Sequence, residues 1–161
     1  MITVTKKHSF SSAHRLYNYN GQCEHLHGHN YIVEISIISK ELNNLGMVID
    51  FDDIKKILIV ALDQIWDHKT LLYNQDPLCQ KLSDLLNDGS VCAVPFNPTA
   101  ENMAAYLGTE FFPTVLKESK VQDDIKVISV TVYETINNCA TWHLASLIPT
   151  GKPVGLHDNP E

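Results

Sequence analysis

Two segments near the start of the chain carry the residue patterns of β-strands. Residues 2–14 alternate between apolar and polar side chains, and residues 28–39 are rich in β-branched and aromatic residues. The loop between them, residues 15–26, contains the turn-forming pair Asn20-Gly21. We therefore predict that the two strands pair as an antiparallel hairpin.

Two later segments place apolar residues at helical spacing. The first begins after Asp50, a residue that can cap a helix, and spans about four turns. Its apolar positions are Phe51, Ile54, Leu58, Ala61, Leu62 and Ile65. The second starts at Thr99 as its N-cap and runs to about Lys117, and we expect Pro113 to kink or interrupt its last turns.

The remaining segments complete the order strand, strand, helix, helix, strand, strand. Residues 67–98 read as irregular, with a short helical pattern at 77–86 and a strand pattern at 91–96. Two further strands are predicted at residues 125–135 and 140–146. Because no repeat or linker divides the sequence, we expect one domain over residues 1–148 and a C-terminal tail over residues 149–161.

Composition and charge argue against several classes of function. The chain has 161 residues, 44% of them hydrophobic, which is enough for one packed core. The net charge is −7 and Arg15 is the single arginine, so we expect no binding to nucleic acid. Its apolar runs fall far short of the roughly 20 residues that cross a bilayer, and the first residues lack the apolar stretch of a signal peptide. We therefore expect no membrane partner and no secretion.

The four cysteines point to a reducing compartment. They show neither a C-x-x-C pair nor a regular disulfide framework. We predict that they are free thiols in a cytoplasmic protein.

Histidines are the most conspicuous chemical feature, because four of the eight lie between His14 and His29. Side chains two apart in a strand share a face, so His27 and His29 project together, and a hairpin would bring His14 alongside them, with Gly28 permitting close approach. Three neutral imidazoles with an open fourth position are typical of catalytic zinc. The H-x-H pair alone could instead be two surface histidines, and His25 is a less favoured substitute ligand because it lies in the loop.

Three further side chains could transfer protons near such an ion. Cys23 lies four residues before His27, and a nearby cation lowers the pKa of a thiol, so its thiolate could take a proton from a substrate. A fourth zinc ligand and a simple loop thiol are the alternatives for Cys23. Asp67 and His68 could form a proton relay if both converge on Cys23, whereas Asp–His pairs at helix ends are otherwise commonly solvated.

A carboxylate on a later strand is a candidate for binding a ligand. Glu134 shares a strand face with Val130 and Val132, so we expect its side chain to face an apolar layer. A ligand with two adjacent N–H groups would satisfy it there, unless it reaches water near the strand end.

These motifs occur together, in one order, over most of residues 2–145. The blocks are Phe10-Ser-Ser-Ala-His14, Cys23-Glu-His-Leu-His27-Gly-His29-Asn-Tyr31, Gly46-Met-Val-Ile-Asp50-Phe51, Asp67-His68-Lys69, Pro98-Thr99-Ala-Glu101-Asn102 and Glu134-Thr135. In this combination the chain resembles the 6-pyruvoyl-tetrahydropterin synthase family, including its queuosine-pathway branch, 6-carboxytetrahydropterin synthase. The resemblance implies that zinc is held by His14, His27 and His29. It also implies that protons are transferred by Cys23, Asp67 and His68. Glu134 would anchor the pterin ring, with Thr99 near it.

The resemblance also implies a reaction. The short spacing Cys23-x-x-x-His27 looks like the queuosine branch. That branch converts 7,8-dihydroneopterin triphosphate to 6-carboxy-5,6,7,8-tetrahydropterin and releases acetaldehyde and triphosphate. The alternatives are a 6-pyruvoyl-tetrahydropterin synthase, which eliminates triphosphate and keeps the side chain, and a non-catalytic zinc-stabilised pterin-binding module. Glu24 leaves cleavage to a hydroxymethylpterin open, because some relatives use a glutamate near this point.

The implied fold class is α+β, the tunnelling fold, with a four-stranded antiparallel sheet and two helices packed on one face. In this family three subunits join their sheets into a barrel and two trimers stack, so a homohexamer with active sites at subunit interfaces is expected. Cations are needed for the triphosphate, and the candidates are Lys6, Lys7, Arg15 and Lys69.

Overall fold

The computed structural model describes residues 2–121 and 124–145, and its centre is the expected hairpin. Strand β1 (Thr3–His14) and strand β2 (His27–Ile38) pair antiparallel over their full length, from Thr3 opposite Ile38 to His14 opposite His27. Strands β5 (Lys126–Thr135) and β6 (Asn138–His143) continue the antiparallel sheet beyond β2. The ββ–ββ core of the fold is therefore confirmed.

The sheet has six strands rather than the predicted four. Strands β3 (Lys69–Tyr73) and β4 (Val91–Val94) add to the other side of β1 in parallel orientation, giving the order β4-β3-β1-β2-β5-β6. The sequence showed a strand pattern for β4 but not for β3. Strand β3 was missed because Leu71, Leu72 and Tyr73 are buried in succession. A short strand buried on both faces does not alternate and therefore lacks the period-two signal.

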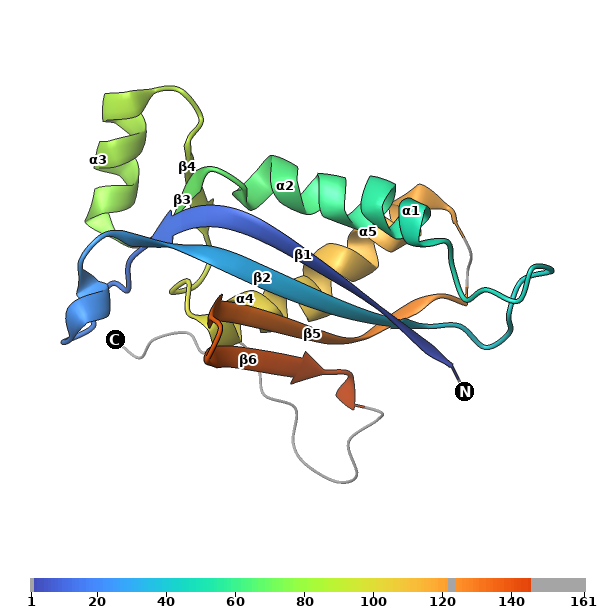
Figure 1. Cartoon of the computed structure of the whole chain (residues 1–161). Coiled ribbons are helices and arrows are strands. Elements are labelled where there is room, and N and C mark those ends of the chain that lie inside the picture. The colour runs from blue at the N-terminus through green and yellow to red at the C-terminus, as the bar shows by residue number, and fades with distance from the viewer. Residues whose placement is uncertain (1, 122–123, 146–161) are drawn as a thin grey trace.

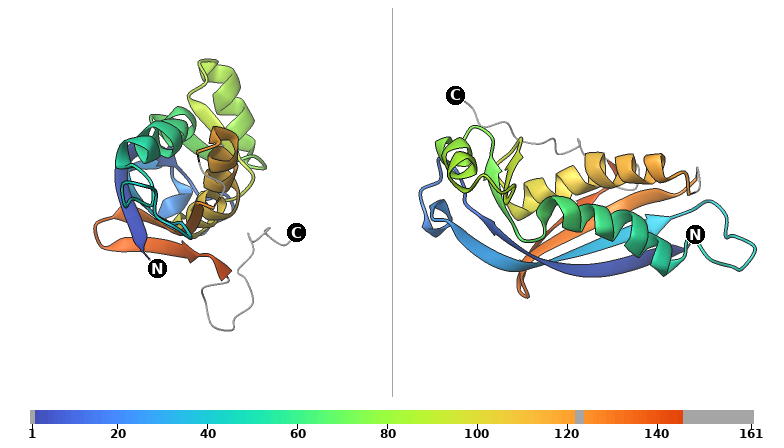
Figure 2. Two further views of the ribbon diagram at one scale, coloured as in Figure 1. Left: turned by 90° about the vertical axis from the view of Figure 1, so that its right-hand side faces the viewer. Right: turned by 90° about the horizontal axis from the view of Figure 1, so that it is seen from above.

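Two long helical stretches cover one face of the curled sheet (Figures 1 and 2). The first comprises α1 (Phe51–Ile54), a π-helical turn (Lys55–Ile59) and α2 (Val60–Trp66), and Asp50 caps it by accepting from Asp52 N. The second comprises α4 (Ala100–Tyr106), a π-helical turn (Leu107–Phe111) and α5 (Phe112–Ser119). A separate helix, α3 (Pro77–Leu86), stands beside β3 and β4 at one end of the molecule.

Pro113 does not interrupt the second helical stretch, contrary to expectation. It stands in the first turn of α5, directly after the π-helical turn. Proline lacks an N–H and its ring crowds the carbonyl one turn earlier, and a wider π turn at this point accommodates both. The helix therefore continues to Ser119.

The core lies between the helical layer and the inner face of the sheet. Its fully buried side chains come from β2, β5 and both helical stretches, and include Tyr31, Val33, Ile35, Val130, Val132, Leu58, Leu62, Trp66, Met103 and Phe112. The outer face of β1 carries exposed Thr, Lys and Ser side chains at alternate positions. None of the helices in the described ranges is both long enough and apolar enough to cross a bilayer. The predicted tail, residues 149–161, lies outside the described residues.

The loop after β1 is held by hydrogen bonds to two other parts of the chain and by one bond within the loop. The Arg15 guanidinium donates two hydrogen bonds, of 2.6 and 2.5 Å, to the buried carboxylate of Asp76, which also caps α3. Tyr17 N donates to Asn97 Oδ1 at 2.8 Å, and Asn97 Nδ2 donates back to Tyr17 O at 3.0 Å. Leu16 N donates to Cys23 O at 2.8 Å and closes the loop on itself.

The Arg15–Asp76 pair should make the folded protein less stable at acid pH. Burial alone would raise the pKa of Asp76, but the bonds from Arg15 and Leu78 N outweigh it and hold the pKa below 3.8. The pair's contribution is therefore present above about pH 3.8 and lost as the pH falls through the lowered native pKa. Asp76→Asn keeps a capping side chain but leaves Arg15 without its counter-charge, and we expect a loss of about 2–3 kcal/mol at pH 7.

Urea unfolding of the wild type and Asp76→Asn at pH 7 and about pH 3 measures this contribution. The difference between the two proteins should shrink at the lower pH. An equal difference at both pH values would show that the ion pair is not its source.

Candidate functional site

Three imidazoles converge at one end of the inner face of the sheet. His14 is the last residue of β1 and lies directly opposite His27, the first residue of β2, while His29 follows two residues later on the same face. A ligand atom of each ring lies within 4.8 Å of the others, and the His14 ring is almost completely buried. A Cβ on Gly28 would lie 3.2 Å from Ser12 O, so the glycine permits this close approach of the two strands.

The hydrogen bonds of two rings orient their free nitrogens toward one point. His14 Nδ1 donates to Pro98 O and His27 Nδ1 donates to His25 O, both at 2.7 Å. In the neutral rings each Nε2 then carries a lone pair, yet the two Nε2 atoms are only 3.2 Å apart. Two lone pairs facing each other need a cation between them, and ligands of tetrahedral zinc lie about 3.3 Å apart. The donor set therefore fits a metal ion.

Electrostatics keeps the cluster suitable for coordination. Burial lowers the pKa of His14 to about 4, against a smaller opposing effect of its bond to Pro98, so the ring is neutral at pH 7. Burial also lowers the pKa of His29, opposed by the charge of Glu134. Neutral imidazole is the form that binds metals.

The carbonyl that orients His14 is itself held in place. Asn102 Nδ2 donates to Asn97 O at 3.0 Å, so Asn97, which also clamps Tyr17, fixes the turn that presents Pro98 O. Such outer contacts set the orientation of metal-ligating histidines. Asn97 was not among the candidate residues predicted from the sequence. The signal that could have identified it is the Asn97-Pro98 pair directly before the helix cap Thr99.

Three protein ligands, and no fourth, converge at this point in the described part of the chain. Among the described residues, no other set of three or more histidine, cysteine or acidic side chains brings its ligand atoms this close, and Cys23 is not part of the set. Glu134 Oε1 comes to 4.0 Å from His14 Nε2 and is partly exposed. His25 points into solvent and serves the cluster only through its carbonyl. A metal here would thus keep a coordination position free of protein.

Cys23 and Glu24 lie in a single 3₁₀ turn, Gln22–Glu24, in the loop between β1 and β2. The Cys23 thiol is free and half-buried, and the loop is closed by the bond from Leu16 N to Cys23 O. Glu24 is exposed and approaches His25 at 3.8 Å. The structure thus leaves the thiol, rather than Glu24, as the less exposed of the two reactive side chains.

Asp67 and His68 form a hydrogen-bonded pair at the other edge of β1. Asp67 Oδ2 is 2.9 Å from His68 Nδ1, and Asp67 Oδ1 accepts from Ser11 N at 2.9 Å. Burial opposes the charge of Asp67, but these two bonds outweigh it and lower its pKa. His68 adopts a left-handed backbone with φ 56° and projects its ring into solvent, 82% exposed. The relay geometry within the pair is therefore present.

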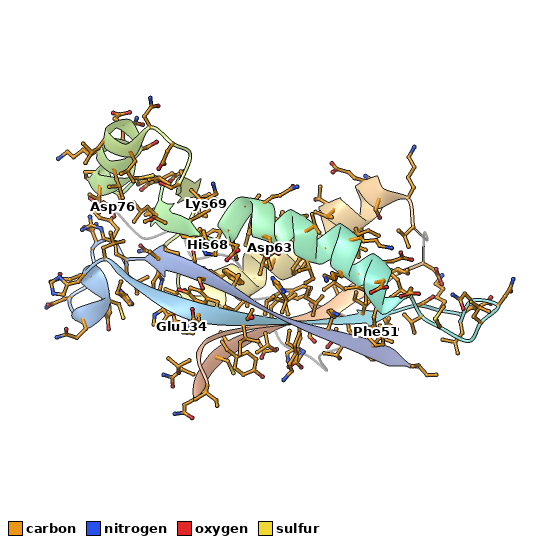
Figure 3. All side chains as sticks on the ribbon, turned by 45° about the horizontal axis from the view of Figure 1, so that its top comes forward. Phe51, Asp63, His68, Lys69, Asp76 and Glu134 are labelled. Atoms are coloured by element: carbon orange, nitrogen blue, oxygen red, sulfur yellow. The ribbon has the colours of Figure 1, made fainter. Side chains whose placement is uncertain are left out.

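Asp67 and His68 are not among the side chains that converge with the histidine cluster of their own chain. His68 and Lys69 border a hollow of about 480 Å³, whose lining includes the exposed Ser11, Gly28 and Asn30 and also His29 of the cluster. Figure 3 shows His68 and Lys69 on the β3 side of β1, while Glu134 lies on β5, beyond β2.

Thr99 has a structural partner, as its role as N-cap predicts. Its hydroxyl accepts from Asn102 N at 3.2 Å, and its side chain borders a hollow of about 270 Å³ with Tyr17 and Tyr73. The predicted contact of Thr99 with a pterin stays a prediction.

The candidate phosphate-binding cations are mostly engaged. Arg15 pairs with Asp76, Lys7 pairs with Glu34 at 2.8 Å, and Lys69 donates to Gly89 O at 2.7 Å. Arg15 is thus a structural residue here, because its two donors are directed at a buried carboxylate.

Known proteins that are similar to this chain in sequence or fold include named tetrahydropterin synthases. The chain is 34% identical over 137 residues to 6-carboxy-5,6,7,8-tetrahydropterin synthase of Rickettsia typhi, covering 85% of this chain and 96% of the relative. Among solved structures, an uncharacterized protein from Wolinella succinogenes superposes with a TM-score of 0.74 at 24% identity, over 88% of this chain and 97% of that one. The 6-pyruvoyl tetrahydropterin synthase of Caenorhabditis elegans superposes with a TM-score of 0.59 at 25% identity, over 89% and 96%.

A family description fits nearly the whole described chain. The model for 6-pyruvoyl tetrahydropterin synthase matches residues 3–144, from the first strand to just beyond the last. Because this match and the Rickettsia typhi relative each cover most of the sequence, the chain belongs to the 6-pyruvoyl tetrahydropterin synthase family.

Proposed function

We propose that this protein is a zinc-dependent 6-carboxy-5,6,7,8-tetrahydropterin synthase. It would convert 7,8-dihydroneopterin triphosphate and one water molecule to 6-carboxy-5,6,7,8-tetrahydropterin, acetaldehyde and triphosphate, a step of queuosine biosynthesis in the cytoplasm. The observation that carries the proposal is the trio His14, His27 and His29, whose ring nitrogens all lie within 4.8 Å of one another. The name of the Rickettsia typhi relative supports the carboxy product.

Each residue of the site has a chemical task under this proposal. Zinc, when bound by the three histidines, polarises the oxygens of the substrate side chain and acidifies the neighbouring protons. Cys23 takes such a proton as a thiolate, and His68, oriented by Asp67, returns one elsewhere. Glu134 accepts two hydrogen bonds from adjacent N–H groups of the pterin. No external redox cofactor is required, because the redox change is internal to the substrate.

Metal content, turnover and product test this function directly. We expect about one zinc per chain, and a loss of affinity of more than about 100-fold in His29→Ala, which removes a ligand. Cys23→Ala should keep its zinc and lose turnover. These values follow from a chelator-competition titration and from mass spectrometry of the products of 7,8-dihydroneopterin triphosphate.

Two alternative functions give different results in the same assay. A 6-pyruvoyl-tetrahydropterin synthase, the name carried by the Caenorhabditis elegans structure, would release triphosphate but no acetaldehyde. A zinc-stabilised pterin-binding module would give no product, and Cys23→Ala would then change nothing measurable. Acetaldehyde release by the zinc-loaded protein and its loss on chelation distinguish the carboxy synthase from both.

We also propose that the complete site forms between copies of the chain in a homohexamer built as a dimer of trimers. Supporting this, neither Asp67 nor His68 belongs to the set of side chains that converges with the histidine trio of their own chain, and the His68 ring is largely exposed. In the described part of the chain, β6 pairs only with β5, and β1 meets β3 only at Ser12–His14. The free side of β6 and the part of β1 that β3 does not cover therefore leave backbone groups available for pairing with another sheet.

Mixing two inactive variants tests whether the site is shared. Cys23→Ala is defective in one half of the proposed site and His68→Ala in the other. In oligomers refolded from an equal mixture, Cys23 is intact in half of the chains and His68 in the other half. A shared site then has both residues intact in about one case in four, so about a quarter of wild-type activity should return. Cys23→Ala mixed with His29→Ala is the matched control, since both changes fall in the same half and no intact site can form. Equal failure of both mixtures would contradict a shared site.

A further inference from the structure

Tyr31 carries a polar group that the protein itself leaves without a partner. The residue is completely buried, and within the described ranges its hydroxyl is the one buried side-chain polar atom that lacks a hydrogen bond. Burying an unpaired hydroxyl costs stability, and buried polar groups in folded proteins nearly always have partners. A phenylalanine would fill the same space without this cost, so packing alone does not account for the hydroxyl.

The hydroxyl belongs to the site because of where the ring is held. Tyr31 follows His27 and His29 at alternate positions of β2, so the three side chains share one face. Its ring meets the His29 ring edge to face at 5.4 Å between centroids and the His14 ring at 5.7 Å. On its other side it stacks on Phe10 at 5.3 Å, which fixes its orientation.

The substrate-binding carboxylate approaches the same point from the next strand. Ile32 pairs with Tyr133, so continuing this antiparallel register places Glu134 across from Tyr31. Glu134 Oε1 in turn lies 4.0 Å from His14 Nε2. Tyr31 therefore adjoins both the metal-binding imidazoles and the strand position of the proposed pterin anchor.

We propose that the Tyr31 hydroxyl donates a hydrogen bond to an oxygen of the pterin substrate's three-carbon side chain. This inference rests on the proposed function, because it requires a substrate that spans from Glu134 to the histidine trio. The orphaned donor acquires its partner only when the substrate binds. The sequence contained the signal, since Tyr31 continues the alternation of His27 and His29 on one face.

Tyr31→Phe removes the donor and keeps the ring. We expect kcat/KM for 7,8-dihydroneopterin triphosphate to fall about tenfold or more, the effect of losing one hydrogen bond to substrate. Zinc affinity should stay the same, because the three imidazoles are untouched. The melting temperature without substrate should be equal to or above that of the wild type, because an unpaired buried hydroxyl is gone.

Tyr106→Phe is the matched control. This tyrosine is partly buried but packs against Trp66 and Phe96, away from the histidine trio, so its replacement should leave kcat/KM unchanged. Unchanged kcat/KM in Tyr31→Phe would overturn the inference, as would a lower melting temperature with a loss of zinc, which would reveal a structural role. If the zinc-loaded wild type does not act on this substrate at all, the proposed function fails first and the inference fails with it.

Discussion

The register of β1 against β2 is the constraint on which the site depends. Pairing from Thr3–Ile38 to His14–His27 places three imidazoles from two strands on one inner face, with Tyr31 opposite Phe10 in the row beyond. A shift of one residue would move every side chain of one strand to the opposite face, and the cluster would not exist. The long hairpin, buried on its inner side against both helical stretches, fixes that register through the side chains of Val33, Ile35 and Ile37.

Contacts from the loops and turns around the hairpin orient the histidine rings that the register brings together. Backbone carbonyls of Pro98 and His25 set the tautomers of two rings, and the Asn97 clamp ties the Pro98 turn to the chain that leaves β1. The Arg15–Asp76 pair fastens the same loop to the start of α3. The orientation of the ring nitrogens therefore comes from contacts distant in sequence and from no single motif.

Much of the site could be predicted from local periodicity, and the remainder depends on tertiary contacts. The alternation of His27, His29 and Tyr31 and the hairpin pairing with His14 follow from the strand period. Strand β3 was not predicted because its buried residues do not alternate, and Pro113 was expected to kink or interrupt a helix that continues through a π turn to Ser119. The position of Asp67 and His68 relative to the cluster could not be predicted, because it depends on which side of β1 the parallel strand β3 joins. Likewise, Arg15 was a candidate phosphate ligand in the sequence, and its pairing with Asp76 depends on a tertiary contact that local sequence does not predict.

The proposed chemistry depends on an ion that is held by three imidazoles and keeps one exchangeable position. X-ray absorption spectroscopy of the zinc-loaded protein measures this coordination directly. It should show three nitrogen ligands at about 2.0–2.1 Å and one further light-atom ligand that changes when substrate is added. A sulfur ligand at about 2.3 Å, which would place Cys23 on the metal and close the site, would contradict the account, as would a protein that takes up no zinc.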